Sequence, residues 1–256
     1  MSDLKGLIFD VDGTLADTEQ EGHRVAFNMA FSDVGLDWYW DENTYGKLLD
    51  VFGGKERIRY FVESFPNDND FNAPADLDRF IRDVHARKTV HYISLLKSGS
   101  IPLRTGVARL IREAREANLR MAIASTTTPE NATSLLRETL GEQSIGWFEV
   151  LACGDVVPHK KPAPDIYEYT LKQLDLPSSD CLVIEDSESG LKSALGAGLK
   201  TLVTINHFTR NHDFAGAEIV LDCLGEPGEA FTVLSGKAGG ASWVDVAFLE
   251  RIHSSP

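Results

Sequence analysis

Five short runs of branched and apolar residues restrict the possible folds of this chain more than any other feature. They cover residues 7–10, 120–125, 149–153, 181–185 and 201–205. From the second run onward, consecutive runs are separated by one helical pattern or a short connection, which favours a parallel sheet. Parallel sheets occur in α/β proteins, whose helices cover the sheet. We therefore predict an α/β fold.

The segment between the first two runs has helical periodicity and no strand signal. Its apolar residues repeat every three or four positions in three stripes, with a loop at residues 65–70 after the second: Phe27, Ala30, Phe31 and Val34; Ile58, Phe61, Val62 and Phe65; Leu77, Phe80, Ile81 and Val84. We predict a helical cap of residues 17–103, with hinges at 15–17 and 99–103, inserted into a core of residues 1–16 and 104–256. Insertions at exposed connections are tolerated, and a lid beside an active site fits here.

Composition limits the partners and the compartment. The chain of 256 residues has a formal net charge of −14, which argues against nucleic acid or an anionic membrane as a partner. Three cysteines without C-x-x-C spacing, Cys153, Cys181 and Cys223, indicate free thiols. No signal pattern is present, and no apolar run approaches the ~20 residues of a membrane span. We expect a cytoplasmic monomer that binds a small molecule.

The first apolar run ends in two carboxylates, Asp10 and Asp12, followed by Gly13 and Thr14. In an extended chain, residues i and i+2 point the same way, and parallel sheets bind ligands beyond the carboxyl ends of their strands. Adjacent carboxylates repel unless a divalent cation or a shared proton offsets their charge. The pair suggests a magnesium-dependent nucleophile with an acid/base partner, although a solvated acidic turn has the same pattern.

Three further motifs follow the later runs. Ser125 ends one run and opens a stretch of hydroxyl residues before Pro129. A helix that begins at this proline can direct its N-terminal amides toward an anion. The alternative interpretation is a capped helix without a bound anion. Lys161 begins a Lys-Pro-Ala-Pro segment whose prolines stiffen the approach to the next helix. Glu185 and Asp186 end another run. Asp186, Asp10 and the main-chain carbonyl of Asp12 offer the hard oxygen ligands that magnesium prefers.

These four motifs, in this order, resemble those of the haloacid dehalogenase-like phosphatases over nearly the whole chain. The resemblance implies a Rossmann-like, doubly wound parallel sheet with an inserted helical cap. It also implies that Asp10 forms an aspartyl-phosphate and that Asp12 is the acid/base. Mg²⁺ as cofactor and two groups of site residues are implied as well: Asp10, Asp12, Glu185 and Asp186 at the metal, and Ser125, Thr126 and Lys161 at the phosphate.

Motifs in the cap narrow the resemblance. Two glycines followed by Lys55, Glu56 and Arg57 bring positive charge to a helix start in an acidic protein, which indicates a second anion site or simply a solvated helix. Together with the core motifs they resemble the CbbY-type sugar phosphatases, which are similar to β-phosphoglucomutase. That resemblance implies xylulose-1,5-bisphosphate, a Rubisco inhibitor, as substrate, with contacts at Glu19, Gly53, Gly54, Lys55, Glu56, Arg57, Lys88, Thr127, Thr128 and Asn131.

Two other functions remain open from the sequence. A phosphomutase uses the same core motifs and returns the phosphate to another hydroxyl group. A non-catalytic phospho-receiver also uses clustered aspartates, magnesium, a hydroxyl residue and a lysine, but it lacks an inserted cap. The pattern assigns no function to residues 206–256.

Overall fold

The structure is a computed structural model that describes residues 4–51, 53–65 and 76–255. These residues form two compact units. One contains the chain up to Asp17 and from Pro102 onward, and the other extends from Thr18 to Ile101. The two points at which the chain passes from one unit to the other fall at or beside the predicted hinges. The role of each unit remains a prediction.

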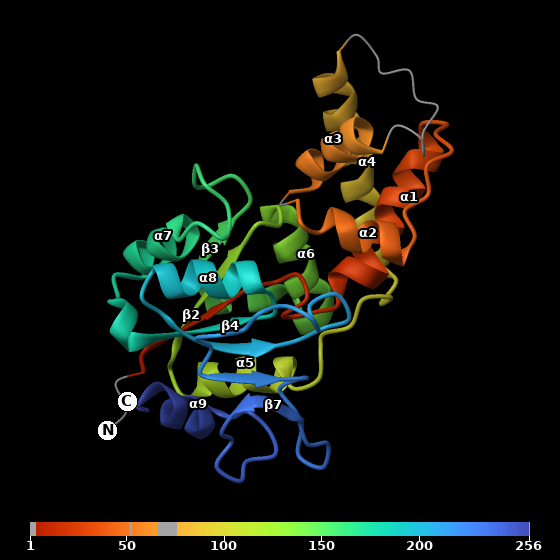
Figure 1. The fold of residues 1–256 in the computed structure, drawn as a ribbon. Coiled ribbons are helices and arrows are strands. Elements are labelled where there is room, and N and C mark those ends of the chain that lie inside the picture. The colour runs from red at the N-terminus through yellow and green to blue at the C-terminus, as the bar shows by residue number, and fades with distance from the viewer. Residues whose placement is uncertain (1–3, 52, 66–75, 256) are drawn as a thin grey trace. The chain divides into compact units, whose positions relative to one another are not determined.

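A seven-stranded sheet forms the centre of the first unit (Figure 1). Its strand order is β3-β2-β1-β4-β5-β6-β7, and only β7 is antiparallel to its neighbour. The strands span Gly6–Phe9 (β1), Arg120–Ser125 (β2), Phe148–Cys153 (β3), Cys181–Glu185 (β4), Lys200–Thr204 (β5), Ile219–Leu221 (β6) and Val233–Gly236 (β7). The predicted fold class is confirmed.

The central position of β1 fixes where the site lies. In the sheet register, Phe9 pairs with Ile123 of β2 on one side and with Ile184 of β4 on the other. The residues that follow these three strands therefore meet at one edge of the sheet. Because β1 and β4 are buried along their whole length, they can carry polar groups to this edge through an apolar core.

Helices cover both faces of the sheet, as Figure 1 shows with α7 and α8 on one face and α5 and α9 on the other. Ile166 and Tyr167 of α7 pack with Ile8 and Val183 in one hydrophobic cluster of buried residues. The helices of this unit are α5 (Val107–Glu116), α6 (Pro129–Leu140), α7 (Asp165–Leu174), α8 (Glu188–Gly196) and α9 (Val246–His253), with 3-10 turns at Glu142–Trp147 and Ser178–Asp180.

The second unit is helical, as the three apolar stripes predict. After a π-helical turn at Glu19–His23 come α1 (Arg24–Asp33), α2 (Glu42–Leu48), α3 (Gly54–Ser64) and α4 (Leu77–Lys97). Its core is aromatic: the rings of Phe27 and Phe31 each lie 4.7 Å from that of Trp40. Helix α2 was not predicted, and residues 66–70 of the predicted loop lie outside the described residues.

Two composition-based expectations can be compared with the structure. The three cysteines are free thiols, as predicted, with Cys153 and Cys181 buried and Cys223 half-buried. None of the described helices has both the length and the apolar composition that a membrane span requires.

Candidate active site

Asp10 is the first residue after β1 and is almost completely buried. Its amide donates to the carbonyl of Ile184, 3.0 Å away, which holds the backbone of Asp10 beside β4. Burial raises the pKa of Asp10 to about 7, while the charge of Lys161 acts in the opposite direction. An ionised carboxylate at this position therefore needs positive charge close by.

The chain turns sharply after Asp12. Gly13 has φ +85°, a conformation that L side chains rarely adopt, and a Cβ built there would lie 2.3 Å from Oδ2 of Asp186. The Gly13 amide donates to Ala16 O, and the Leu15 amide donates to Val11 O. The glycine therefore allows the loop after β1 to contact the acidic end of β4.

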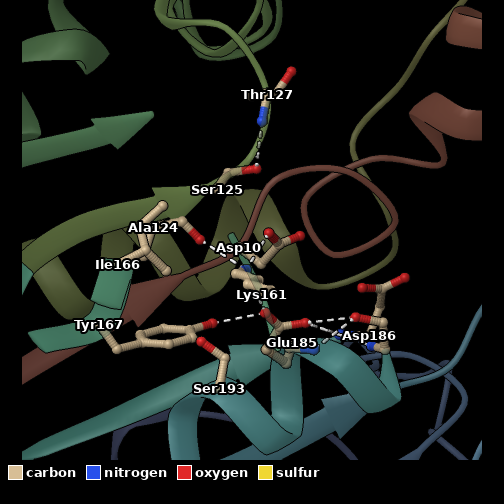
Figure 2. A network of polar contacts seen from close by, with 12 residues as sticks. Asp10, Ala124, Ser125, Thr127, Lys161, Ile166, Tyr167, Glu185, Asp186 and Ser193 are labelled. Atoms are coloured by element: carbon tan, nitrogen blue, oxygen red, sulfur yellow. Dashed lines mark hydrogen bonds and ion pairs between the residues drawn. The ribbon is translucent and has the colours of Figure 1, made fainter. Parts of the chain in front are cut away.

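Lys161 joins three strand ends through its ammonium group (Figure 2). Its Nζ lies 2.7 Å from Oδ1 of Asp10, 2.5 Å from Oε1 of Glu185 and 2.9 Å from the carbonyl oxygen of Ala124. Burial disfavours the charged ammonium, but attraction by Asp10 and Glu185 wins and holds the pKa of Lys161 well above its usual range. The lysine is therefore a permanent cation beside the candidate nucleophile.

Glu185 is fully buried, and both of its oxygens accept hydrogen bonds. Oε1 accepts from Lys161 and from the Tyr167 hydroxyl at 2.6 Å, and Oε2 accepts from the Asp186 amide at 3.0 Å and from the amide and hydroxyl groups of Ser187. A Cβ at Gly190 would lie 2.0 Å from this carboxylate. The glycine in the fourth motif therefore makes room for Glu185.

The carboxylates of Asp10, Glu185 and Asp186 form one buried acidic group, with an oxygen from each lying within 4.8 Å of the others. Burial raises the pKa of Asp186 well above its usual range, and repulsion by Glu185 and Asp10 adds to this effect. One lysine cannot neutralise three carboxylates, so ionising all three requires a further cation. The hard oxygen donors fit a divalent ion such as Mg²⁺.

The hydroxyl-rich segment follows β2, the strand beside β1. The Ser125 hydroxyl accepts from the Thr127 amide at 3.3 Å (Figure 2). The Thr128 hydroxyl caps α6 by accepting from the Asn131 amide, and the Asn131 side-chain amide donates to the Thr127 hydroxyl. Thr128 therefore caps α6, as the capped-helix alternative predicts, and its role at a ligand stays a prediction. Thr126 lies between Ser125 and Thr127 in the same bend.

The predicted cap residues fall into separate clusters inside the helical unit. Nη1 of Arg57 lies 2.8 Å from the Tyr45 hydroxyl and 3.5 Å from Oε2 of Glu19, and the Tyr45 hydroxyl donates to the same glutamate oxygen. In a second cluster, the buried Nζ of Lys88 lies 2.7 Å from Nδ1 of His23.

The remaining predicted cap residues lie at the start of α3. Gly53 has φ +97° and precedes the helix, and a Cβ at Gly54 would lie 2.6 Å from the His85 ring. Lys55 and Glu56 follow in the first turn of α3. The two glycines therefore allow the helix to begin close to the His85 side chain.

Sequence reasoning missed three residues with contacts at the core site. Tyr167 lies six positions after Lys161, at the end of the segment that the Lys-Pro-Ala-Pro residues begin, and its nearness to this segment was the available signal. Arg104 stands one residue beyond the predicted hinge. Asn206, which contacts Asp186, belongs to the segment without an assigned function, and no local pattern marked it.

A family model described as haloacid dehalogenase-like hydrolase matches residues 4–198. The chain belongs to the haloacid dehalogenase-like hydrolases. It is 45% identical to "Protein CbbY, plasmid" of Cupriavidus necator over 98% of this chain and 97% of the relative. It is also 44% identical to CbbY of Cereibacter sphaeroides over 88% of this chain and 94% of the relative.

Solved structures give the same result. CbbY from Rhodobacter sphaeroides in complex with phosphate has a TM-score of 0.79 at 43% identity, covering 86% of this chain and 94% of that one. The same values hold for a mutant of that protein in complex with xylulose-(1,5)-bisphosphate. The predicted family and its phosphatase enzyme class are confirmed. The roles of individual site residues in this haloacid dehalogenase-like hydrolase stay predictions.

Proposed function

We propose that this hydrolase is a Mg²⁺-dependent phosphatase that removes a phosphate from xylulose-1,5-bisphosphate through a phosphorylated Asp10. The observation that carries the proposal is the buried group of Asp10, Lys161, Glu185 and Asp186 at the carboxyl edge of the sheet. Such a group offers a nucleophilic carboxylate, a fixed cation and oxygen donors for a metal within one small volume.

In the first step, a carboxylate oxygen of Asp10 attacks phosphorus and the bond from phosphorus to the sugar oxygen breaks. Asp12 gives its proton to that leaving oxygen. In the second step, Asp12 takes a proton from a water molecule, which attacks phosphorus and breaks the bond to Asp10. Inorganic phosphate is released and both aspartates return to their starting states.

The surrounding residues offset the charge of the transferring group. Lys161 already lies 2.7 Å from Asp10 and is held there by Glu185, so little reorganisation is needed when charge develops. Ser125 and the Thr126 amide would contribute hydrogen-bond donors at the neighbouring strand end. Mg²⁺, held by Asp10, Asp186, Glu185 and the Asp12 carbonyl, would neutralise phosphoryl charge when bound.

The choice of a sugar bisphosphate is supported by the CbbY structure that contains one. In this chain, the positively charged residues at the start of α3 would bind the second phosphate, and Glu19 and Lys88 would contact the sugar. The hydroxyl and amide groups of Thr127, Thr128 and Asn131 would contribute the remaining contacts. Gly53 and Gly54 would allow the backbone to approach the ligand closely.

The test is release of inorganic phosphate, with and without Mg²⁺, from xylulose-1,5-bisphosphate and from a panel of pentose and hexose mono- and bisphosphates. We expect the highest kcat/KM for the xylulose bisphosphate, with one phosphate released for each substrate consumed. A product that keeps both phosphates, with one moved to another hydroxyl, would show a mutase. The absence of turnover on every sugar phosphate would contradict the proposal.

A further inference from the structure

Asn206, in the loop after β5, binds directly to one of the proposed metal ligands. Its Nδ2 lies 2.5 Å from Oδ2 of Asp186, and 3.5 Å from the carbonyl oxygen of Gly13. The same amide group therefore contacts both the end of β4 and the loop after the candidate nucleophile. No sequence motif includes this residue.

The orientation of the Asn206 amide is fixed by its other contacts. Oδ1 accepts from the Phe208 amide at 2.9 Å, and the Asn206 main-chain amide donates to the Thr209 hydroxyl at 2.9 Å. Because Oδ1 faces a donor and Nδ2 faces two acceptors, the opposite amide orientation would lose these bonds. The side chain is therefore held by its own loop and donates to Asp186.

Arg104 anchors the loop that carries Asn206. Its mostly buried guanidinium donates to the carbonyl oxygens of Thr204, Ile205 and Asp222, and also to that of Gly13. A planar guanidinium with five donors can satisfy several carbonyls at once. Arg104 thereby connects the ends of β5 and β6 with the loop after β1.

We infer that Asn206 is a positioning residue that orients the Asp186 carboxylate for the metal. The bond from the amide to Oδ2 restricts rotation of the Asp186 carboxylate and leaves Oδ1 as the oxygen that would bind the cation. Groups that hydrogen-bond to a metal ligand commonly change metal affinity by about 10–100-fold when they are removed. The inference rests on the proposed function because it requires a metal at Asp186.

The test is Mg²⁺ binding measured by titration calorimetry without substrate, on the full chain and on Asn206→Ala. We expect the Kd for Mg²⁺ to rise about 10-fold or more in the variant. Asn211→Ala is the matched control, because Asn211 is an exposed asparagine five positions further along the chain; its Kd should equal that of the unchanged chain. Thermal unfolding of each metal-free protein reports any loss of fold separately.

Asn206→Ser is the second variant. A serine hydroxyl can still accept from the loop backbone, as in a turn, but it is too short to reach Asp186. We expect the same rise in Kd with the loop preserved. If either variant is folded and its Kd for Mg²⁺ is unchanged, the inference about Asn206 is overturned, although the proposed metal site is not. Failure of the unchanged chain to bind Mg²⁺ would overturn the metal site and the inference together.

Discussion

At the scale of single residues, the protonation of Asp10 couples the site to stability. Burial raises its pKa in the folded chain from 3.8 to about 7, so between these values the folded state binds a proton that the unfolded state has lost. This stabilisation is complete below pH 3.8 and is lost as the pH rises through about 7. The metal-free protein should therefore lose stability across this window.

The first prediction concerns Asp10→Asn, which replaces the titrating carboxyl group of Asp10 with an amide that does not titrate. In the presence of a chelator, the Tm of the unchanged protein should fall more steeply with rising pH than that of the variant, with the difference growing between about pH 4 and pH 7. Differential scanning calorimetry measures both. Parallel Tm curves for the two proteins would show that the Asp10 carboxyl is not held in an environment that favours its proton.

Lys161 provides a second prediction at this scale. Lys161→Met leaves Asp10 and Glu185 buried without their cation, and breaking such a pair costs roughly 3–5 kcal/mol. Lys160→Met is the matched control, because the side chain of Lys160 is 21% exposed and pairs with an exposed aspartate; its cost should stay below about 1 kcal/mol. Equal losses in urea unfolding would mean that Lys161 contributes no special stabilisation.

At the scale of elements, the strands and helices that could be predicted from the sequence were those with long buried apolar stretches. Strands β1 and β4 are buried on both faces, so their continuous apolar runs identified them directly. Strand β6 is buried and apolar but has only three residues, too few to stand out in the sequence, and β7 is exposed along its length and has no continuous apolar run. Helix α2 spans seven residues, too few for a clear periodic stripe.

The start of α3 carries a prediction about substrate choice. If Lys55 binds the second phosphate, Lys55→Ala removes a charge-assisted contact with it. The KM for a sugar bisphosphate should then rise about 10-fold or more. The KM for the matching monophosphate should change little. Arg79→Ala, which removes an exposed charge on α4, is the control. Steady-state kinetics on both substrates measures the two KM values. Equal increases in KM for the bisphosphate and the monophosphate would exclude a contact between Lys55 and the second phosphate.

At the scale of the whole molecule, the sequence predicted the fold class and the four motifs, but not the contacts that connect the motifs. Lys161 was identified as a site residue by its Lys-Pro-Ala-Pro segment, and Glu185 by its place at the end of an apolar run. Arg104 and Asn206 depend on partners such as Gly13, which lies 91 and 193 positions away along the chain. Such contacts follow from the packing of strand ends, which local patterns do not encode.

The charge of the molecule also acts at this scale. A net charge of −14 opposes the approach of any phosphate ester, so binding depends on local cations such as Lys161 and on a metal. The predicted monomeric state and cytoplasmic location stay predictions.

The central claim is that Asp10 accepts the phosphoryl group. Rapid mixing of the Mg²⁺-loaded enzyme with xylulose-1,5-bisphosphate, acid quenching within one turnover and mass spectrometry of the tryptic peptide of residues 6–24 test it directly. The account predicts that this peptide gains the mass of one phosphoryl group, located on Asp10, and that the added mass disappears as turnover completes. Phosphate release with no labelled peptide at any time within the turnover, or a phosphoryl group on Asp12, would contradict it.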